Sequence, residues 1–336
     1  MKSKVIVSVI IPVFNGASFL FDVYTMMENQ TFHDWECIFI DDGSTDDSLD
    51  ILTKFARNDD RFSVLTQPNM GVSAARNVGI EASVGEYICM IDCDDYIHPD
   101  YISYLYELIN IYDADMSCCA VLKLNSRTFD SLDNRADKRI LYDSRSATED
   151  FFYRRHLIGY PFLKLIKKDY AKEVSFVTSM KSAEDEVFTF QVIRKCKTIV
   201  YGGRNLYLYY QNPESATHGK LKAADFEYSW TYMHKHIEPM VSHDELIFNA
   251  YTVREFIWAI DLYLRIENED CESFKNELVS FIDNSKYLVL KNKCASISNR
   301  ILALIGVVAT NEMLFRACKL FLSMEAKGYV QRRRPA

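Results

Sequence analysis

The stretch Tyr87–Asp95, which reads YICMIDCDD, decides the fold. Its first five residues, Tyr87–Ile91, form a short apolar run of the kind found in strands that are buried on both faces. The last four residues place three carboxylates directly behind that run. A buried strand that ends in clustered acidic groups predicts a parallel sheet whose carboxyl edge carries the chemistry.

Asp92 and Asp94 are separated by one residue. In an extended segment alternate side chains point the same way, so both carboxylates can share one oxygen-seeking cation. Mg²⁺ or Mn²⁺ suits a site with few carboxylates and room for water and phosphate. The alternative interpretation is a capped turn ahead of a helix that starts near Pro99.

Comparable apolar runs flank this stretch on both sides and alternate with segments of helical periodicity. The other predicted strands are Val5–Ile11, Glu36–Ile40, Phe62–Leu65 and Met116–Leu124. The predicted helices between them are Phe19–Met27, Ser48–Ala56, Val72–Ala82 and Pro99–Tyr112. This alternation predicts an α/β fold with a mostly parallel sheet, flanking helices and right-handed crossovers.

The remainder of the chain is less regular until residue 222. Residues 126–160 are predicted to be an irregular, charged insertion. Beyond it we expect a helix at Val187–Arg194 and two strands, Thr198–Tyr201 and Leu206–Tyr210. From Lys222 onward almost every segment has helical periodicity, so a C-terminal helical extension is expected.

Polar groups also follow the other predicted strands. The first strand runs into Pro12-Val13-Phe14-Asn15-Gly16, the second ends in Asp41-Asp42-Gly43-Ser44, and the third leads to Asn69 and on to Arg76. Five aspartates and one arginine therefore converge on one edge of the predicted sheet. Folding alone does not require this cluster, because neighbouring carboxylates repel and need a compensating cation.

Composition excludes several classes of protein. The chain has 336 residues, 49% of them hydrophobic and 26% charged, which excludes a disordered chain. Its net charge of −8 argues against a nucleic-acid-binding surface. Residues 286–336 contain ten Lys/Arg and two Glu, a local charge of +8, so residues 1–285 carry −16. A basic tail of this kind predicts contact with an anionic partner.

Cysteine usage and the N-terminus predict a cytoplasmic location. The nine cysteines are an odd number with no C-x-x-C pair, which favours a reducing compartment. Val5–Ile11 is short and stopped by Pro12, so we interpret it as a first strand and not as a signal peptide. No G-x-G-x-x-G or G-x-x-x-x-G-K-[ST] motif supports a dinucleotide-binding or P-loop protein.

These motifs resemble the family 2 glycosyltransferases of the GT-A (Rossmann-like) fold, of the bacterial surface-polysaccharide type. The resemblance rests on the order and spacing of residues 9–15, 30–32, 41–46, 71–77 and 92–95. It implies a nucleotide-sugar-binding half at residues 1–125, an acceptor-binding half at 126–220 and a helical C-terminal region at 221–336. The donor it implies is a UDP-sugar.

The resemblance also assigns roles to individual residues on the donor side. Those expected to line the donor site are Pro12, Phe14, Asn15, Asp41 and Asp42 for uridine, Arg76 for the diphosphate or for order in the pocket, and Asp92 and Cys93. The metal, Mn²⁺ or Mg²⁺, is expected on Asp94 and Asp92. His218, near the loop that closes over the diphosphate, is expected to complete the metal or phosphate shell, or else to be merely solvated.

On the acceptor side, the pair Glu184-Asp185 opens a predicted helix. By resemblance Asp185 is the catalytic base, with Glu184 as the second candidate. The alternative is that both carboxylates only favour the positive end of the helix. The acceptor implied is a hydroxyl of a growing surface glycan or of a lipid-linked oligosaccharide, and attack on the face opposite the leaving group inverts the anomeric centre.

Two other functions stay open at this point. A non-catalytic subunit that binds sugar nucleotides or glycans would keep the uridine pocket without needing Asp94 and Asp185 together. A nucleotidyltransferase would need a Gly-rich loop with a cation after the first strand, and Val13–Gly16 contains no cation.

The C-terminal region raises the question of a membrane or a second copy. Ile301–Ala309 is apolar but is interrupted before the roughly 20 residues that a membrane span needs. At helical spacing a shared face is predicted for Ile301, Leu304, Ile305, Val308, Phe315 and Leu322. This helix either docks on the protein or, as the basic residues favour, lies peripherally on the inner membrane face. The aromatic helices between Phe226 and Leu264 either pack inward or form a homodimer face.

Overall fold

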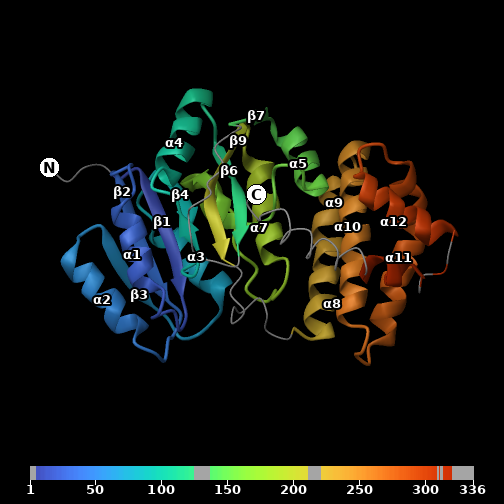
Figure 1. Cartoon of the computed structure of the whole chain (residues 1–336), viewed down its shortest axis with the longest axis horizontal. Coiled ribbons are helices and arrows are strands. Elements are labelled where there is room, and N and C mark those ends of the chain that lie inside the picture. Colours follow the sequence, from blue (N-terminus) through green and yellow to red (C-terminus); the bar gives the residue numbers. More distant parts are fainter. Residues whose placement is uncertain (1–4, 125–136, 211–220, 309, 311–312, 320–336) are drawn as a thin grey trace, which may run out of the picture. The chain divides into compact units, whose positions relative to one another are not determined.

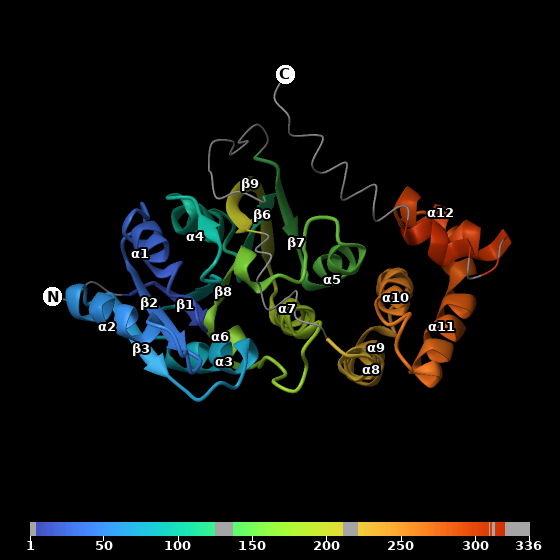
Figure 2. The same ribbon diagram turned by 60° about the horizontal axis from the view of Figure 1, so that its bottom comes forward.

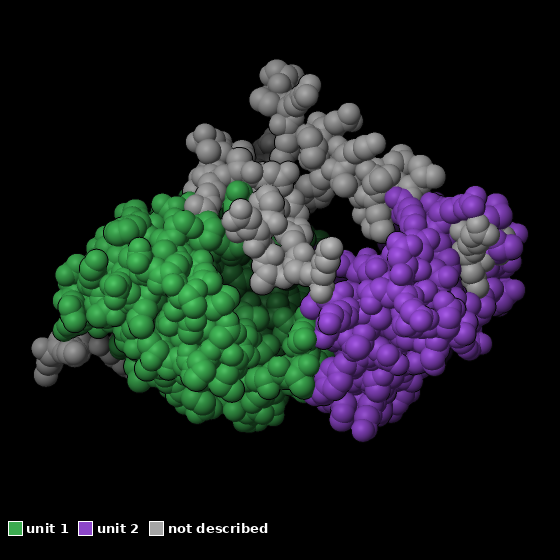
Figure 3. Space-filling model, turned by 90° about the horizontal axis from the view of Figure 1, so that it is seen from below, with its two compact units in different colours: residues 1–151, 156–220 green, residues 152–155, 221–336 purple. Residues whose placement is uncertain are grey.

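The computed structural model describes residues 5–124, 137–210, 221–308, 310 and 313–319. The chain forms two compact units (Figure 3). Unit 1 comprises residues 1–151 and 156–220, and unit 2 comprises residues 152–155 and 221–336. Apart from residues 152–155, the two predicted halves of the α/β domain both belong to unit 1.

Unit 1 is built on one mixed sheet (Figure 1). In spatial order its strands are β3 (Phe62–Thr66), β2 (Trp35–Asp41), β1 (Val7–Val13), β4 (Tyr87–Met90), β8 (Lys164–Lys167), β6 (Met116–Leu124), β9 (Ile199–Tyr210) and β5 (Tyr96–Ile97), and β7 (Arg139–Tyr142) pairs with β9. Strands β1 to β4 pair in parallel, as do β6 and β9. Antiparallel β8 joins these two parallel groups, and β5 and β7 run antiparallel to β9.

Helices cover both faces of this sheet (Figure 2). One face carries α1 (Leu20–Glu28), α2 (Ser48–Asn58) and α4 (Tyr101–Tyr112), and the other carries α3 (Val72–Ala82), α6 (Lys168–Lys172) and α7 (Glu184–Lys195). The α/β class with flanking helices is therefore confirmed. The strands and helices predicted within residues 1–125 all exist, with ends displaced by at most two residues.

Alternating side chains on β1 explain how these layers pack. Val9 belongs to the core cluster shared with α1, α2 and α4, whereas Ile10 points to the opposite face, where α3 crosses. There Gly79 of α3 lies so close that a Cβ would sit 2.3 Å from Ile10 Cγ2. Only a glycine permits this approach. Close packing of α3 brings its N-terminal half, with Arg76, against the sheet.

The prediction of an irregular insertion at residues 126–160 is wrong for the second half of this range. β7 and the helix α5 (Ser144–Tyr153) lie there. The Asp143 carboxylate accepts a hydrogen bond from the backbone N–H of Ser146, so a side chain stabilises the start of the helix. Phe151 and Phe152 are buried. The high charge of the segment concealed this short amphipathic pattern.

The two separate strands predicted at Thr198–Tyr201 and Leu206–Tyr210 are also wrong, because β9 is continuous. Its pairing with β6 shifts from Cys119–Gly202 to Ala120–Asn205. A bulge in β9 absorbs the extra residues. The two adjacent glycines at 202 and 203 resemble a turn in sequence but form this bulge in the structure.

Unit 2 is helical. It contains α8 (Ala223–Tyr232), a π-helical turn (Met233–Ile237), α9 (Glu238–Val241), α10 (Glu245–Arg265), α11 (Glu272–Lys291) and α12 (Ile297–Val308). Phe226, Trp230 and Phe256 are buried in its core, so these aromatic residues pack inward. Among the helices that the structure describes, none has the length and apolar character needed to cross a bilayer.

Candidate active site

The first two loops at the carboxyl edge of the sheet hold each other in place. Asn15 Oδ1 accepts a hydrogen bond from the backbone N–H of Thr45 at 2.7 Å, and the backbone N–H of Asn15 donates to Ser44 Oγ at 3.0 Å. Asn15 itself adopts a left-handed φ of 51°. Between these anchored residues and the buried Pro12 of β1, the Phe14 side chain is 49% exposed. This arrangement presents one aromatic ring on a rigid backbone.

The two aspartates after β2 have different environments. Asp42 accepts hydrogen bonds from Gln67 Nε2 and from the backbone N–H groups of Met70 and Gly71, at 2.7 to 2.8 Å. It therefore organises the loop that precedes α3. Asp41 is equally buried, yet within the described residues its Oδ1 has no hydrogen-bond partner. A buried acceptor without a partner is costly, so Asp41 is suited to accept a hydrogen bond from a bound ligand.

Arg76 joins the two halves of unit 1. One guanidinium nitrogen donates to Asp92 Oδ1 at 2.9 Å and another donates to Asp185 Oδ1 at 2.6 Å. The arginine is 4% exposed, whereas both carboxylates are 25% exposed. Its guanidinium also lies 5.3 Å from the centroid of the Phe176 ring. The fork-shaped cation thus holds two partly open carboxylates, one on each of its terminal nitrogens.

Asp95, the third carboxylate of the Asp92–Asp95 stretch, is hydrogen-bonded to residues of β9. Asp95 is buried, and it accepts hydrogen bonds from the Tyr207 hydroxyl at 2.7 Å and from the backbone N–H of Tyr210 at 2.9 Å. Burial raises the pKa of Asp95 well above its usual range. The Tyr207 hydroxyl also accepts a hydrogen bond from the backbone N–H of Asp92. Asp95 therefore fastens the β4 end to β9.

Cys93 and Asp94 complete that stretch. The Cys93 Sγ lies where it would touch a Cβ on Gly16 of the first loop, at 3.2 Å, and burial raises the pKa of its thiol. Cys93 therefore packs the segment after β4 against the first loop. Asp94 is half-buried.

Asp185 is the second residue of α7, which begins at Glu184 directly after Ala183, whose φ is 63°. Burial raises the pKa of Asp185 to about 7, with the charge of Glu184 adding to the rise and that of Arg76 opposing it. Burial also raises the pKa of Glu184. A carboxyl group whose pKa is near neutrality is suited to accept and release a proton at physiological pH.

Lys164 is a buried cation beside Asp185 that the sequence analysis assigned no role. Its ammonium donates to the backbone carbonyl groups of Ile158, at 2.8 Å, and Tyr160. Burial lowers its pKa, an effect that the Asp185 charge partly offsets. The available signal for Lys164 was a charged residue inside the apolar run Pro161–Ile166, which reads PFLKLI. Tyr207 is a second residue that was missed, and its only signal was its place inside the predicted strand Leu206–Tyr210.

The structure thus brings Arg76, Asp92 and Asp185 together. It also groups five predicted donor-site residues at the ends of β1 and β2 and in the two linked loops that follow, namely Pro12, Phe14, Asn15, Asp41 and Asp42. His218 lies outside the described residues. Within the described part of the chain, no three metal-ligating side chains converge. Asp92 and Asp94 fit Mg²⁺ or Mn²⁺ only as a partial set, because these ions take their remaining ligands from water and phosphate oxygens.

A mixed sheet with helices on both faces, and acidic loops at the carboxyl ends of its parallel strands, defines a GT-A fold. The family model described as glycosyl transferase family 2 matches residues 8–175. Glycosyltransferase GlyG of Streptococcus pneumoniae serotype 4 is 30% identical over 238 residues, which cover 67% of this chain and 75% of GlyG. The chain therefore belongs to glycosyl transferase family 2 and is a glycosyltransferase.

Solved structures agree with this fold. TarS 1–349 of S. aureus, in complex with UDP-GlcNAc, matches with a TM-score of 0.67 and 18% identity, over 89% of this chain and 90% of that chain. The mannosyltransferase PcManGT of Pyrobaculum calidifontis, in complex with GDP-Man and Mn²⁺, matches with a TM-score of 0.50 and 13% identity, over 98% and 83%. These likenesses confirm the GT-A expectation.

Proposed function

We propose that this glycosyltransferase moves a hexosyl or N-acetylhexosaminyl group from a UDP-sugar to a hydroxyl of a growing surface glycan, with inversion at the anomeric carbon. The observation that carries the proposal is the Arg76 bridge between Asp92 on the donor side and Asp185 on the acceptor side. A donor sugar and an acceptor hydroxyl bound near these two carboxylates would meet beside one cation. The acceptor class we favour is a glycan or a lipid-linked oligosaccharide.

Asp185 is the residue that we assign as the base. An acceptor hydroxyl must lose its proton as it attacks, and a positioned carboxylate that takes it contributes typically 10²–10⁴-fold to the rate. Because burial raises the pKa of Asp185 to about 7, its carboxylate can both accept and release a proton near neutral pH. Attack from the Asp185 side, opposite the leaving phosphate, gives inversion. Glu184 remains the second candidate because it shares the same first turn of α7.

The donor pocket is assigned to the first two loops. The exposed Phe14 ring is suited to stack on a flat pyrimidine base. Asp41 Oδ1, which has no partner among the described residues, is suited to accept a hydrogen bond from the N–H group of that base. TarS has the same fold and was solved in complex with UDP-GlcNAc, which supports a UDP-sugar as the donor. Because loop shape sets selectivity among similar sugars, the proposal stops at this donor class.

A divalent cation is part of the proposal. Asp94 and Asp92 would hold Mn²⁺ or Mg²⁺, as the Mn²⁺ present in the PcManGT complex supports. When bound, such an ion neutralises negative charge on a departing diphosphate. This chain's own contribution is to orient Asp92, through Arg76 and through the Asp92 N–H bond to Tyr207.

The test measures UDP release from a panel of UDP-sugars with and without EDTA, and donor binding by calorimetry. We expect Asp185→Asn to lower turnover by about 10²–10⁴-fold and to leave donor affinity within about threefold. Asp169→Asn is the matched control, because Asp169 is also a carboxylate in the first turn of a helix, α6. Equal losses in both variants would mean that Asp185 only favours the helix terminus.

The same measurements, with nucleoside triphosphates added to the donor panel and pyrophosphate release followed as well, distinguish the two other functions. Donor binding without UDP release by the wild-type protein, with every acceptor offered, would indicate a non-catalytic binding subunit. Release of pyrophosphate from a nucleoside triphosphate would indicate a nucleotidyltransferase. Turnover that EDTA does not lower would remove the cation from the proposal and leave the base in place.

A further inference from the structure

Helix α12 in unit 2 exposes a stripe of apolar side chains. Ile297, Ile301, Leu304 and Val308 are 75, 51, 44 and 73% exposed. Their spacing of four, three and four residues places them on one face of the helix, along about 16 Å. We call these four residues the α12 stripe.

The opposite face of the same helix is already buried. Leu302, Ala303 and Gly306 pack into the core of unit 2, where a Cβ on Gly306 would lie 3.2 Å from Leu314 Cδ2. The last eight residues of α12, Ile301–Val308, are all apolar, and a helical segment that is apolar all round is normally covered all round. The described part of unit 2 covers only one side of α12, so the α12 stripe requires another explanation.

The α12 stripe differs from the face predicted from the sequence. Phe315 does not share it, because its ring stacks on that of Tyr263 with centroids 3.9 Å apart. Ile305 is partly buried against the core of unit 2, and Leu322 lies outside the described residues. The structure instead adds Ile297, one turn before Ile301.

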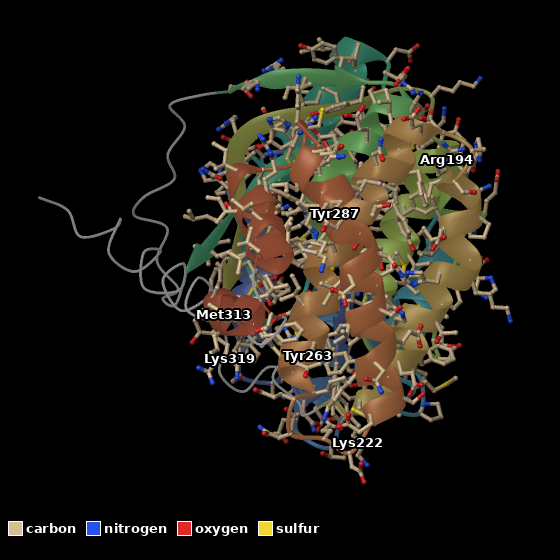
Figure 4. All side chains as sticks on the ribbon, turned by 90° about the vertical axis from the view of Figure 1, so that its right-hand side faces the viewer. Arg194, Lys222, Tyr263, Tyr287, Met313 and Lys319 are labelled. Atoms are coloured by element: carbon tan, nitrogen blue, oxygen red, sulfur yellow. The ribbon has the colours of Figure 1, made fainter. Side chains whose placement is uncertain are left out.

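The chain around the stripe is basic. Residues 286–308 contain four basic residues and no Asp or Glu; Lys286 is paired with Asp283 at 2.7 Å, so Lys291, Lys293 and Arg300 supply the local positive charge. Lys291 and Lys293, between α11 and α12, are exposed. Figure 4 views the molecule from the side that shows unit 2, with Tyr287 of α11 labelled, as well as Met313 and Lys319 from the helical residues that follow α12. Met313 adds a further exposed apolar side chain, at 58%.

We propose that the α12 stripe docks on the surface of a bilayer that contains anionic phospholipids. In this arrangement the four apolar side chains enter the boundary between headgroups and acyl chains, and Lys291 and Lys293 contact the phosphates. Apolar burial and attraction to anionic lipid act together on such a helix. One apolar stripe without basic residues would bind any bilayer weakly, whereas this combination selects an anionic one.

A second copy of the chain is the less suitable occupant. A two-fold interface through the stripe would place Lys291, Lys293 and Arg300 of both copies near each other, and nearby Asp283 already pairs with Lys286. Four side chains also provide much less than the roughly 800 Å² per partner that a stable interface buries. A bilayer needs no such complementary surface.

Docking of α12 would keep the enzyme where a lipid-linked acceptor is presented, a consequence that rests on the proposed function. The docking itself does not, because the test measures binding and not transfer. The full chain is floated through a density gradient with vesicles of equal parts phosphatidylglycerol and phosphatidylcholine, and separately with pure phosphatidylcholine. We expect binding to the first and about tenfold less to the second.

Two double variants test the two components. Ile301→Asp with Leu304→Asp should lower binding to anionic vesicles by about tenfold or more, and so should Lys291→Glu with Lys293→Glu. The matched control is Ile111→Asp, because Ile111 on α4 of unit 1 is 55% exposed and should leave binding unchanged. Circular dichroism melting verifies that each variant is folded.

Three outcomes would overturn the proposal. The first is wild-type protein that does not float with anionic vesicles. The second is unchanged flotation in the Ile301/Leu304 variant. The third is a wild-type dimer in sedimentation velocity that the Ile301/Leu304 variant converts to a monomer while vesicle binding is absent, which would assign the stripe to a second copy.

Discussion

The two units each contain a buried arginine paired with carboxylates, and the pairs differ in their access to solvent. Arg76 in unit 1 bridges Asp92 and Asp185, both of which keep a quarter of their side-chain surface exposed. Arg254 in unit 2 pairs with Glu255, and these side chains are 3% and 0% exposed. Its guanidinium lies 4.3 Å from the centroid of the Trp258 ring. An open pair can turn toward a ligand, whereas a sealed pair can only stabilise or destabilise the fold.

The largest expected effect on stability comes from breaking the sealed pair. Arg254→Met leaves Glu255 in the core without its cation, which should lower the free energy of unfolding by about 3–5 kcal/mol. Urea denaturation followed by circular dichroism measures this change. Arg265→Met is the control, because Arg265 pairs with Asp261 on the surface and should cost less than about 1 kcal/mol. Similar losses in the two variants would contradict the contrast between sealed and exposed pairs.

Breaking the open pair should act mainly on activity. Arg76→Lys replaces a fork that reaches two carboxylates with a single point charge, so we expect kcat/KM to fall about a hundredfold. Steady-state kinetics with the preferred UDP-sugar measure it. Arg61→Lys serves as the control, since Arg61 forms a partly buried pair with Asp59, which has no role in the candidate site, and it should change kcat/KM less than about twofold. A stability loss without a kinetic loss in Arg76→Lys would make the open pair structural as well.

The pH dependence of kcat/KM tests whether Asp185 in the open pair acts as the base. Because burial raises the pKa of Asp185 to about 7, its base form accumulates as pH rises, so kcat/KM should rise up to about pH 7 and level off above it. The Glu184 charge contributes to the raised pKa, so Glu184→Gln should move this limb to lower pH. A limb that disappears in Glu184→Gln would assign it to Glu184 and not to Asp185.

The smallest effect is expected at the link between β4 and β9. Tyr207→Phe removes the donor to buried Asp95 and the acceptor for the Asp92 N–H, which should cost about 1–2 kcal/mol of stability. Thermal unfolding measures it. Tyr96→Phe removes an exposed hydroxyl contact with Asp22 and should cost less. A Tyr207→Phe variant as stable as the wild type would show that Asp95 has other sufficient partners.

Much of unit 1 could be predicted from local patterns. The run at Tyr87–Ile91 and the helix at Val72–Ala82 follow from apolar periodicity, which depends on neighbours in sequence. The strand features that sequence analysis missed include β5, β7, β8 and the bulge of β9, all of which depend on pairing between distant strands. The pair of glycines at 202 and 203 is read as a turn unless Cys119 and Ala120 of β6 are known to lie opposite.

The candidate site shows the same division. Asp92 and Asp185 were both predicted to be functional, but they lie 93 positions apart in the sequence. No sequence pattern indicated that Arg76 bridges them. Nor could the sequence separate Asp95, which is buried against Tyr207, from its neighbours in the same acidic run.

By itself the sequence determined which residue types follow each strand, and therefore that an acidic edge and a basic C-terminal region exist. The tertiary structure decided which carboxylates contact Arg76, which one is buried against β9, and which apolar face of α12 the described residues leave exposed. The reason is physical, because burial, pKa and ion pairing depend on what surrounds a group in space. Those surroundings come mostly from segments far away in the chain.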